Sequence, residues 1–173
     1  MQSDGLADDT KDAVCAHAEN IDASGHGHDE IQSADDAAMN QKWHDFLGGY
    51  ADRKTVIYYY TISTLMCRGE AAIDKFERVL DTFAETAKEG KLVAIFVPQD
   101  YLTANLDKAE DDVRERYLAF VEKVKNTEGV IWDEDNQSLE FIDMWDAYYG
   151  DTGVIAMECA NRKIPVMLEN VDI

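Results

Sequence analysis

Residues 145–170 read WDAYYGDTGVIAMECANRKIPVMLEN and contain the pattern that indicates the fold of this chain. The apolar residues before Gly150 and the run from Pro165 to Leu168 predict two short strands. Between them, the turn Gly150-Asp151-Thr152-Gly153 precedes a helix. A strand, a tight turn, a helix and a second strand together form the repeating unit of a parallel α/β sheet.

The turn itself suggests a binding site. Small polar residues at the start of a helix leave backbone N–H groups pointing at one spot, beside the positive end of the helix dipole, and this geometry suits a phosphate or another anion. It also lies at the carboxyl ends of parallel strands, where α/β proteins bind their ligands. Alternatively, Asp151 and Thr152 only cap the helix.

Upstream of this stretch, apolar strands alternate with amphipathic helices. We predict a first short helix over 41–50, strands at 55–61, 91–97 and 130–132, and helices at 70–88, 107–125 and 138–145. Such alternation implies βαβ units with right-handed crossovers. We therefore expect residues 41–173 to form a Rossmann-like, doubly wound parallel α/β sheet of about five strands, with helices on both faces.

Residues 1–40 have a different composition. They contain ten acidic residues, Lys11 as the one basic residue, and no aromatic residue. Such a segment has too little apolar area to offset its chain entropy, so we expect an acidic disordered tail or interdomain linker. His26 and His28, beside Asp29 and Glu30, could bind Zn²⁺ or Ni²⁺ weakly, but without a fixed scaffold we predict no metal site.

The charge of the whole chain excludes several kinds of partner. Its formal net charge is −20, with 36 acidic and 16 basic residues. This surface repels nucleic-acid phosphates and anionic lipid headgroups. No stretch is long and apolar enough to cross a bilayer, and the amino terminus does not look like a signal peptide. We expect a cytoplasmic protein that binds no nucleic acid, does not insert into a membrane and requires no cofactor.

The three cysteines, Cys15, Cys67 and Cys159, match no zinc motif and do not suggest a disulfide framework. Their pattern fits a reducing compartment. Cys159 lies on the apolar side of the last predicted helix, where a small core residue is expected. Cys67 follows the first strand region, but no histidine close to it in the sequence could activate it as a nucleophile.

Four segments together resemble a known family. These are Lys54-Thr-Val-Ile-Tyr-Tyr-Tyr-Thr-Ile-Ser-Thr-Leu, Ala94-Ile-Phe-Val-Pro-Gln-Asp-Tyr, Asp146-Ala-Tyr-Tyr-Gly-Asp-Thr-Gly-Val and Lys163-Ile-Pro-Val-Met-Leu. Over residues 54–170 the chain resembles the C-terminal half of CDP-glycerol glycerophosphotransferase-like proteins, the bacterial teichoic-acid-type polymerases of cell-envelope polysaccharide synthesis, which have the glycosyltransferase B fold. The resemblance implies a nucleotide-binding Rossmann domain, with the donor phosphates held at the turn that contains Asp151 and Thr152.

The chain departs from that family at three ligand-facing positions. Gly153 replaces a second hydroxyl residue in the turn. After the second strand the family has a functional His, whereas this chain has Gln99 followed by Asp100. Gln carries no proton or positive charge, and Asp100 adds a negative charge. Tyr59-Tyr60-Thr61 stands where the family has a more polar turn. The resemblance therefore implies a degraded site.

Three functions stay open. An active transferase needs an acceptor-binding domain elsewhere in the full-length protein and a general base, and no histidine lies at the end of a predicted strand, so we assign no catalytic residue and expect no activity from this chain alone. A donor-binding domain would recognise a nucleotide-diphospho donor or sugar phosphate weakly. Its predicted ligand-binding residues are Asp151, Thr152, Gly153, Gln99, Thr61 and Glu158. Tyr58 to Thr61, Gln99 and Tyr101 would line the facing wall.

The third is a non-catalytic protein-interaction or structural domain. It could present an aromatic surface patch of Trp132, Trp145, Tyr148 and Tyr149, although each of these residues also fits a half-buried position beside the sheet. The hypotheses differ in what they predict at the carboxyl ends of the strands. Ligand binding predicts an open cleft there, whereas an interaction domain predicts that Tyr101, Tyr148 or Met66 fills it.

Overall fold

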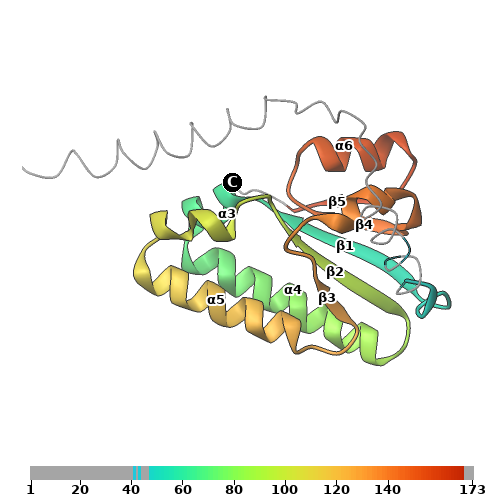
Figure 1. The fold of residues 1–173 in the computed structure, drawn as a ribbon, viewed down its shortest axis with the longest axis horizontal. Helices are drawn as coiled ribbons and strands as arrows, with labels where there is room; N and C mark the ends of the chain where they lie inside the picture. Colours follow the sequence, from blue (N-terminus) through green and yellow to red (C-terminus); the bar gives the residue numbers. More distant parts are fainter. Residues whose placement is uncertain (1–40, 42, 44–46, 170–173) are drawn as a thin grey trace, which may run out of the picture.

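A computed structural model describes residues 41, 43 and 47–169; the predicted acidic tail and four residues of the first predicted helix, 42 and 44–46, lie outside these residues. Five parallel strands form one sheet in the order β3-β2-β1-β4-β5 (Figure 1). The strands are β1 (Lys54–Tyr60), β2 (Leu92–Pro98), β3 (Val130–Trp132), β4 (Ala147–Gly150) and β5 (Val166–Leu168). The predicted α/β fold, with a Rossmann-like parallel sheet of five strands, is confirmed.

Helices cover both faces of this sheet (Figure 1). One face carries the long helices α4 (Glu70–Lys88) and α5 (Asp111–Lys125). The other carries α6 (Val154–Asn161) and the 3₁₀ helix η3 (Gln137–Met144), which the sequence predicted as an α-helix over 138–145. Two elements were not predicted: α3 (Ile62–Arg68) directly after β1, and the 3₁₀ helix η2 (Thr103–Lys108) before α5.

β1 lies at the centre of the sheet because its side chains are apolar on both faces. Tyr58 and Tyr60 are fully buried in the core cluster under α4 and α5, whereas Ile57 is fully buried in the second cluster, under α6 and η3. Successive side chains of a strand point to opposite faces, and a strand covered on both sides needs apolar residues at every position. The run Val-Ile-Tyr-Tyr-Tyr meets that requirement.

The strand order reverses at β1. Ile57 pairs with Ile95 of β2 on one side and with Tyr148 of β4 on the other. The connections that leave β1 and β4 therefore diverge to opposite faces of the sheet. In doubly wound sheets this position is the usual place for a ligand.

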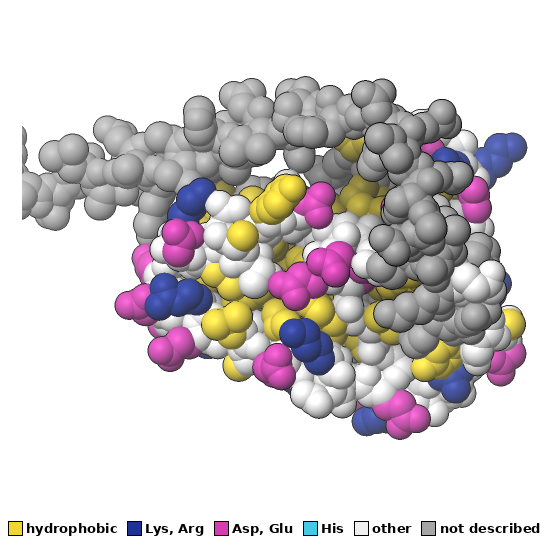
Figure 2. Space-filling view, viewed as in Figure 1, with side chains coloured by type: hydrophobic (Ala, Val, Ile, Leu, Met, Phe, Trp, Pro, Cys, Tyr) yellow, Lys and Arg dark blue, Asp and Glu magenta, His cyan; other side chains and the backbone are white. Residues whose placement is uncertain are grey.

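The exposed surface mixes both signs of charge. Asp and Glu side chains are scattered over the face shown in Figure 2, with Lys and Arg among them. Arg116 of α5, for example, reaches Glu70 and Asp74 of α4, at 3.1 and 2.7 Å. Exposed pairs of this kind contribute little stability. Within the described part of the chain, no helix is long and apolar enough to span a membrane.

The cysteines differ in part from expectation. Cys159 is fully buried in the core, as predicted. Burial raises the pKa of its thiol to about 11, so it is not a reactive group. Cys67, on α3, is disulfide-bonded, which the scattered spacing did not indicate. The cysteine pattern therefore gives no support for a reducing compartment, and the cytoplasmic location stays a prediction.

Gly150 ends β4 where the chain passes closest to β1. Its φ is +144°, and a Cβ atom there would lie 1.9 Å from the carbonyl oxygen of Tyr59. We predict that Gly150→Ala lowers the free energy of unfolding by at least about 3 kcal/mol, because the backbone of two paired strands must move. Urea denaturation followed by circular dichroism measures this change.

Gly153, three residues further, is the matched control. Its φ of 164° is ordinary extended backbone, and no atom lies within 4 Å of an added Cβ. Gly153→Ala should change the free energy of unfolding by no more than about 1 kcal/mol. Equal losses for the two variants would contradict the steric explanation.

Candidate functional site

A polar residue follows every strand of the sheet directly. These residues are Thr61, Gln99, Asp133, Asp151 and Glu169, after β1, β2, β3, β4 and β5 respectively. Four of the five are buried, with exposed fractions of 8% or less, and Gln99 is half-buried. Because the strands are parallel, all five residues lie at the same end of the sheet, where the strands have their carboxyl ends. This polar edge is the candidate site.

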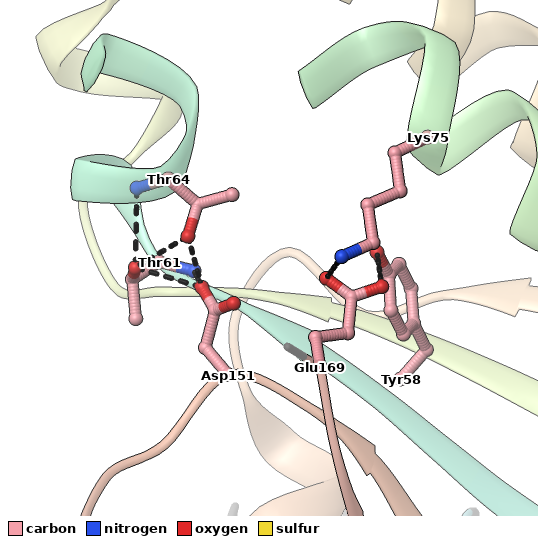
Figure 3. A network of polar contacts seen from close by, with 6 residues as sticks. All are labelled: Tyr58, Thr61, Thr64, Lys75, Asp151 and Glu169. Carbon is pink, nitrogen blue, oxygen red and sulfur yellow. Dashed lines mark hydrogen bonds and ion pairs between the residues drawn. The ribbon is translucent and has the colours of Figure 1, made fainter. Parts of the chain in front are cut away.

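Asp151 is the central residue of the polar edge (Figure 3). Its Oδ2 atom accepts hydrogen bonds from the backbone N–H and the hydroxyl of Thr61, at 2.7 and 2.8 Å, and from the hydroxyl of Thr64 at 2.5 Å. Its own backbone N–H donates to the carbonyl of Tyr59 at 3.0 Å. A carboxylate with these donors is well compensated for its burial. Asp151 therefore ties the end of β4 to the start of α3.

Gln99 closes the same helix start from the other side. Its Oε1 accepts the backbone N–H of Ile62 at 2.9 Å, and its own N–H donates to the carbonyl of Tyr60 at 2.9 Å. Thr61, the N-cap of α3, also accepts from the N–H of Thr64 at 3.4 Å. These groups satisfy the backbone donors that a helix start leaves free. Gln99 is thus used within the chain.

The next acidic residue, Asp100, bonds to a neighbouring loop. Its side chain is exposed, and Oδ1 accepts a hydrogen bond of 2.6 Å from the amide of Asn136. Asp133, after β3, accepts the backbone N–H groups of Gln137 and Ser138, at 3.1 and 2.7 Å, and so caps η3. The polar edge near β2 and β3 is therefore also held by internal bonds.

Glu169 forms a second buried group on the α4 side (Figure 3). Its Oε1 accepts the hydroxyl of Tyr58 at 3.0 Å, and Lys75 of α4 lies 3.2 Å from Oε2. The Lys75 contact is an ion pair without good hydrogen-bond geometry, since Oε2 accepts no hydrogen bond. Burial, with the charge of Glu169, raises the pKa of Tyr58 well above its usual range and that of Tyr149 to about 12.

The turn that leads into α6 is organised differently. Thr152 is exposed, and Gly153, the N-cap of α6, has no side chain to accept a hydrogen bond. The first turn of α6 holds no acidic residue. The backbone donors of this helix start are therefore not closed by a side-chain cap, in contrast to those of α3. A helix start of this kind favours an anion.

The structure brings together only some of the predicted ligand-binding residues. Thr61, Gln99 and Asp151 converge on the start of α3, and Thr152 and Gly153 follow Asp151 directly. Glu158 lies further along α6, where it pairs with Arg162 at 2.7 Å. Three of the six residues, Thr61, Gln99 and Asp151, already form hydrogen bonds within the chain. Ligand binding by the six residues stays a prediction.

Several residues of the polar edge were missed in the sequence. Thr64, Lys75, Asp133 and Glu169 were not singled out, and Tyr58 was expected to line the ligand wall rather than to bond a buried carboxylate. One signal was available: a polar residue ends each predicted strand or follows it within two residues. The partners of those residues come from distant parts of the chain and leave no local pattern.

The predicted aromatic surface patch does not form. Trp145 and Tyr148 are buried, at 4% and 1% exposure, and Trp132 and Tyr149 are half-buried. The Tyr148 hydroxyl donates to the carbonyl of Asp151 at 2.6 Å. The alternative prediction, that these four aromatic residues pack beside the sheet in buried or half-buried positions, agrees with their burial. Tyr101 is 79% exposed, so it is not a residue that fills a cleft at the carboxyl ends of the strands.

Histidine is absent from the described part of the chain. All four histidines, His17, His26, His28 and His44, lie outside it. No group of three or more His, Cys, Asp or Glu residues that could hold a metal occurs within 41, 43 and 47–169.

By its fold, this chain is an α/β domain with a Rossmann-like parallel sheet, and the polar edge lies at the carboxyl ends of its strands. No known protein family matches the chain, and no curated protein is similar to it. The N-terminal domain of Candida albicans trehalose-6-phosphate phosphatase superposes with a TM-score of 0.40 and 19% sequence identity. This match covers 87% of the present chain and 33% of that structure. A similarity this distant carries no functional argument, and the comparisons give no support for the glycerophosphotransferase family.

Asp151→Ala tests the bond between β4 and α3. Removing the carboxylate leaves the buried N–H of Thr61 and two hydroxyls without their acceptor, so we expect the free energy of unfolding to fall by about 2 to 4 kcal/mol. Asp151→Asn, which keeps one oxygen acceptor, should lose less. The control is Asp143→Ala, at an exposed α6-side ion pair, which should change stability by less than about 0.5 kcal/mol. Similar losses at both positions would contradict this role.

The buried tyrosines predict a loss of stability in alkali. The pKa values of Tyr58, Tyr60, Tyr117, Tyr148 and Tyr149 are all raised in the folded protein, chiefly by burial. Unfolded tyrosines ionise near pH 10. Their contribution is therefore complete below about pH 10 and is lost as the pH rises toward the folded values. Urea denaturation from pH 8 to pH 11 should show the decline; a constant stability over this range would contradict it.

Proposed function

We propose that this domain binds the phosphates of a nucleotide-diphospho donor or sugar phosphate at the start of α6. The observation that carries the proposal is the contrast between two helix starts on the polar edge. That of α3 is closed by Asp151 and Gln99, whereas that of α6 follows the exposed Thr152 and has no side-chain cap. The Thr152 hydroxyl and the backbone N–H groups of Gly153 and Val154 would contact the phosphate.

The position of this turn supports the proposal. It follows β4 directly, beside β1, where the strand order reverses. Ligands of doubly wound sheets bind at this kind of point. Gly153 has open space around it, so a ligand can approach the backbone closely. The resemblance to the donor-binding half of CDP-glycerol glycerophosphotransferases concerns the same turn.

Charge limits the affinity that this site can reach. The chain carries a net charge of −20, which slows the approach of an anion, and Asp100 is exposed at the end of the neighbouring strand β2. The contacts offered are backbone donors and one hydroxyl, with no cation placed among them. We therefore propose weak binding and no catalysis by this chain alone; an acceptor-binding domain would belong to another part of the full-length protein.

A thermal-shift titration at low salt tests the proposal, with CDP, CMP, UDP, CDP-glycerol and CDP-ribitol as ligands. A ligand at a hundred times its dissociation constant adds about 2.7 kcal/mol of stability, a rise of several degrees in melting temperature. Thr152→Val should abolish much of this rise, because it replaces the exposed hydroxyl with a methyl group.

The matched control is Thr86→Val, near the end of α4 at the opposite edge of the sheet, where the same change should leave the response intact. Absence of a shift with all five ligands would overturn the proposal. So would a shift that Thr152→Val leaves unchanged.

A non-catalytic interaction domain is the second candidate. It is favoured by the exposed apolar residues of β5, where Met167 and Leu168 are 64% and 48% exposed. Monomeric proteins rarely leave such side chains together at the edge of a sheet. This candidate predicts no response to any nucleotide in the same titration.

A further inference from the structure

A concavity of about 500 Å³ lies on the α4 face of the sheet, between α4 and strands β1, β4 and β5. Its apolar wall includes Val56 of β1, Phe83 of α4, Ala147 and Tyr149 of β4, and Met167 of β5. This volume falls within the range of about 300 to 1,000 Å³ that is usual for small-molecule sites. The concavity faces α4, whereas the α6 turn proposed above as the phosphate site leads to the opposite face.

The rim of this concavity is cationic. Lys75 and Arg78, one turn apart on α4, both line it, and no Asp or Glu is found among its described lining residues. Elsewhere the chain has more than twice as many acidic as basic residues. A cationic rim over an apolar floor is therefore a local exception to the charge of the molecule.

The two cations differ in their partners. Lys75 points to the buried carboxylate of Glu169, at 3.2 Å, so its charge is already compensated (Figure 3). Arg78 is exposed and makes no ion pair with any described residue. Its guanidinium carries five N–H donors in a planar arrangement that matches a carboxylate. The rim thus holds one surplus positive charge above the apolar floor.

We propose that this concavity binds a small amphipathic carboxylate. The apolar body, aromatic or aliphatic, would lie against Phe83, Tyr149 and Met167, and the carboxylate would pair with Arg78. Aromatic rings favour edge or offset contacts with Phe83 and Tyr149, whose own centroids lie 6.2 Å apart at an interplanar angle of 89°. Binding would cover the exposed side chain of Met167 and supply Arg78 with a partner.

Titration of the ¹⁵N-labelled protein with 4-phenylbutyrate, followed by ¹H–¹⁵N chemical shifts, tests this proposal. Shifts should concentrate at Arg78, Phe83, Tyr149 and Met167. The uncharged 4-phenylbutan-1-ol should bind more weakly by about fivefold, the value expected for one partly exposed ion pair. Shifts confined to other parts of the molecule, no saturable binding up to 10 mM, or equal binding of acid and alcohol would each overturn the proposal.

Two variants separate charge from shape. Arg78→Gln should weaken 4-phenylbutyrate binding by about the same factor while leaving the alcohol unaffected. Arg114→Gln, the same change on α5 outside the concavity, should alter neither. Thr82, exposed on the rim, can be replaced by Trp without disturbing the core, and Thr82→Trp should fill the space and abolish binding of both compounds. Undiminished binding by Thr82→Trp would contradict the location.

Discussion

The carboxylate of Asp151 is the interaction on which the polar edge depends. It receives hydrogen bonds from the backbone and hydroxyl of Thr61 and from the hydroxyl of Thr64, and so connects strand β4 to the helix that follows β1. These are the two strands between which the sheet reverses its order. The bond therefore holds the two halves of the sheet in register at their carboxyl ends. The Thr152-Gly153 turn is positioned by the same residue, since it follows Asp151 directly.

This arrangement has a functional meaning. A carboxylate of the chain occupies the start of α3, the place where an α/β protein can hold an external anion. Gln99 and Asp133 are used in a similar way, at the starts of α3 and η3. Of the two helices that follow β1 and β4, α3 has a side-chain cap and α6 has none, which directs the functional hypothesis to Thr152 and Gly153. The cationic rim at Arg78 is a separate feature, on the α4 face of the same sheet.

Much of the fold could be predicted from the sequence, because the relevant signals are local. The apolar run around Tyr58 predicted a central strand, and the helical spacing of Ile73, Phe76 and Leu80 predicted α4 with its correct bounds. α3 was missed because its start is stabilised by Asp151, which is distant in sequence. For the same reason, Asp151 was interpreted as a ligand contact, whereas its Oδ2 is bonded within the chain. The aromatic residues at 145 and 148 were also ambiguous, since burial decides between core and interface and sequence spacing does not.

The position of β1 has a consequence for how the chain assembles. β2, one neighbour of β1, follows it in the sequence after a single crossover. The other neighbour, β4, comes later in the sequence, after β3 and η3, and is therefore synthesised later. During synthesis on the ribosome, the half of the sheet formed by β1, β2 and β3 can therefore associate first, with one long side of its central strand unpaired. That open side is an aggregation hazard until β4 arrives. Pairing between distant segments is also slow, so the late arrival of β4 and Asp151 would limit the rate of folding.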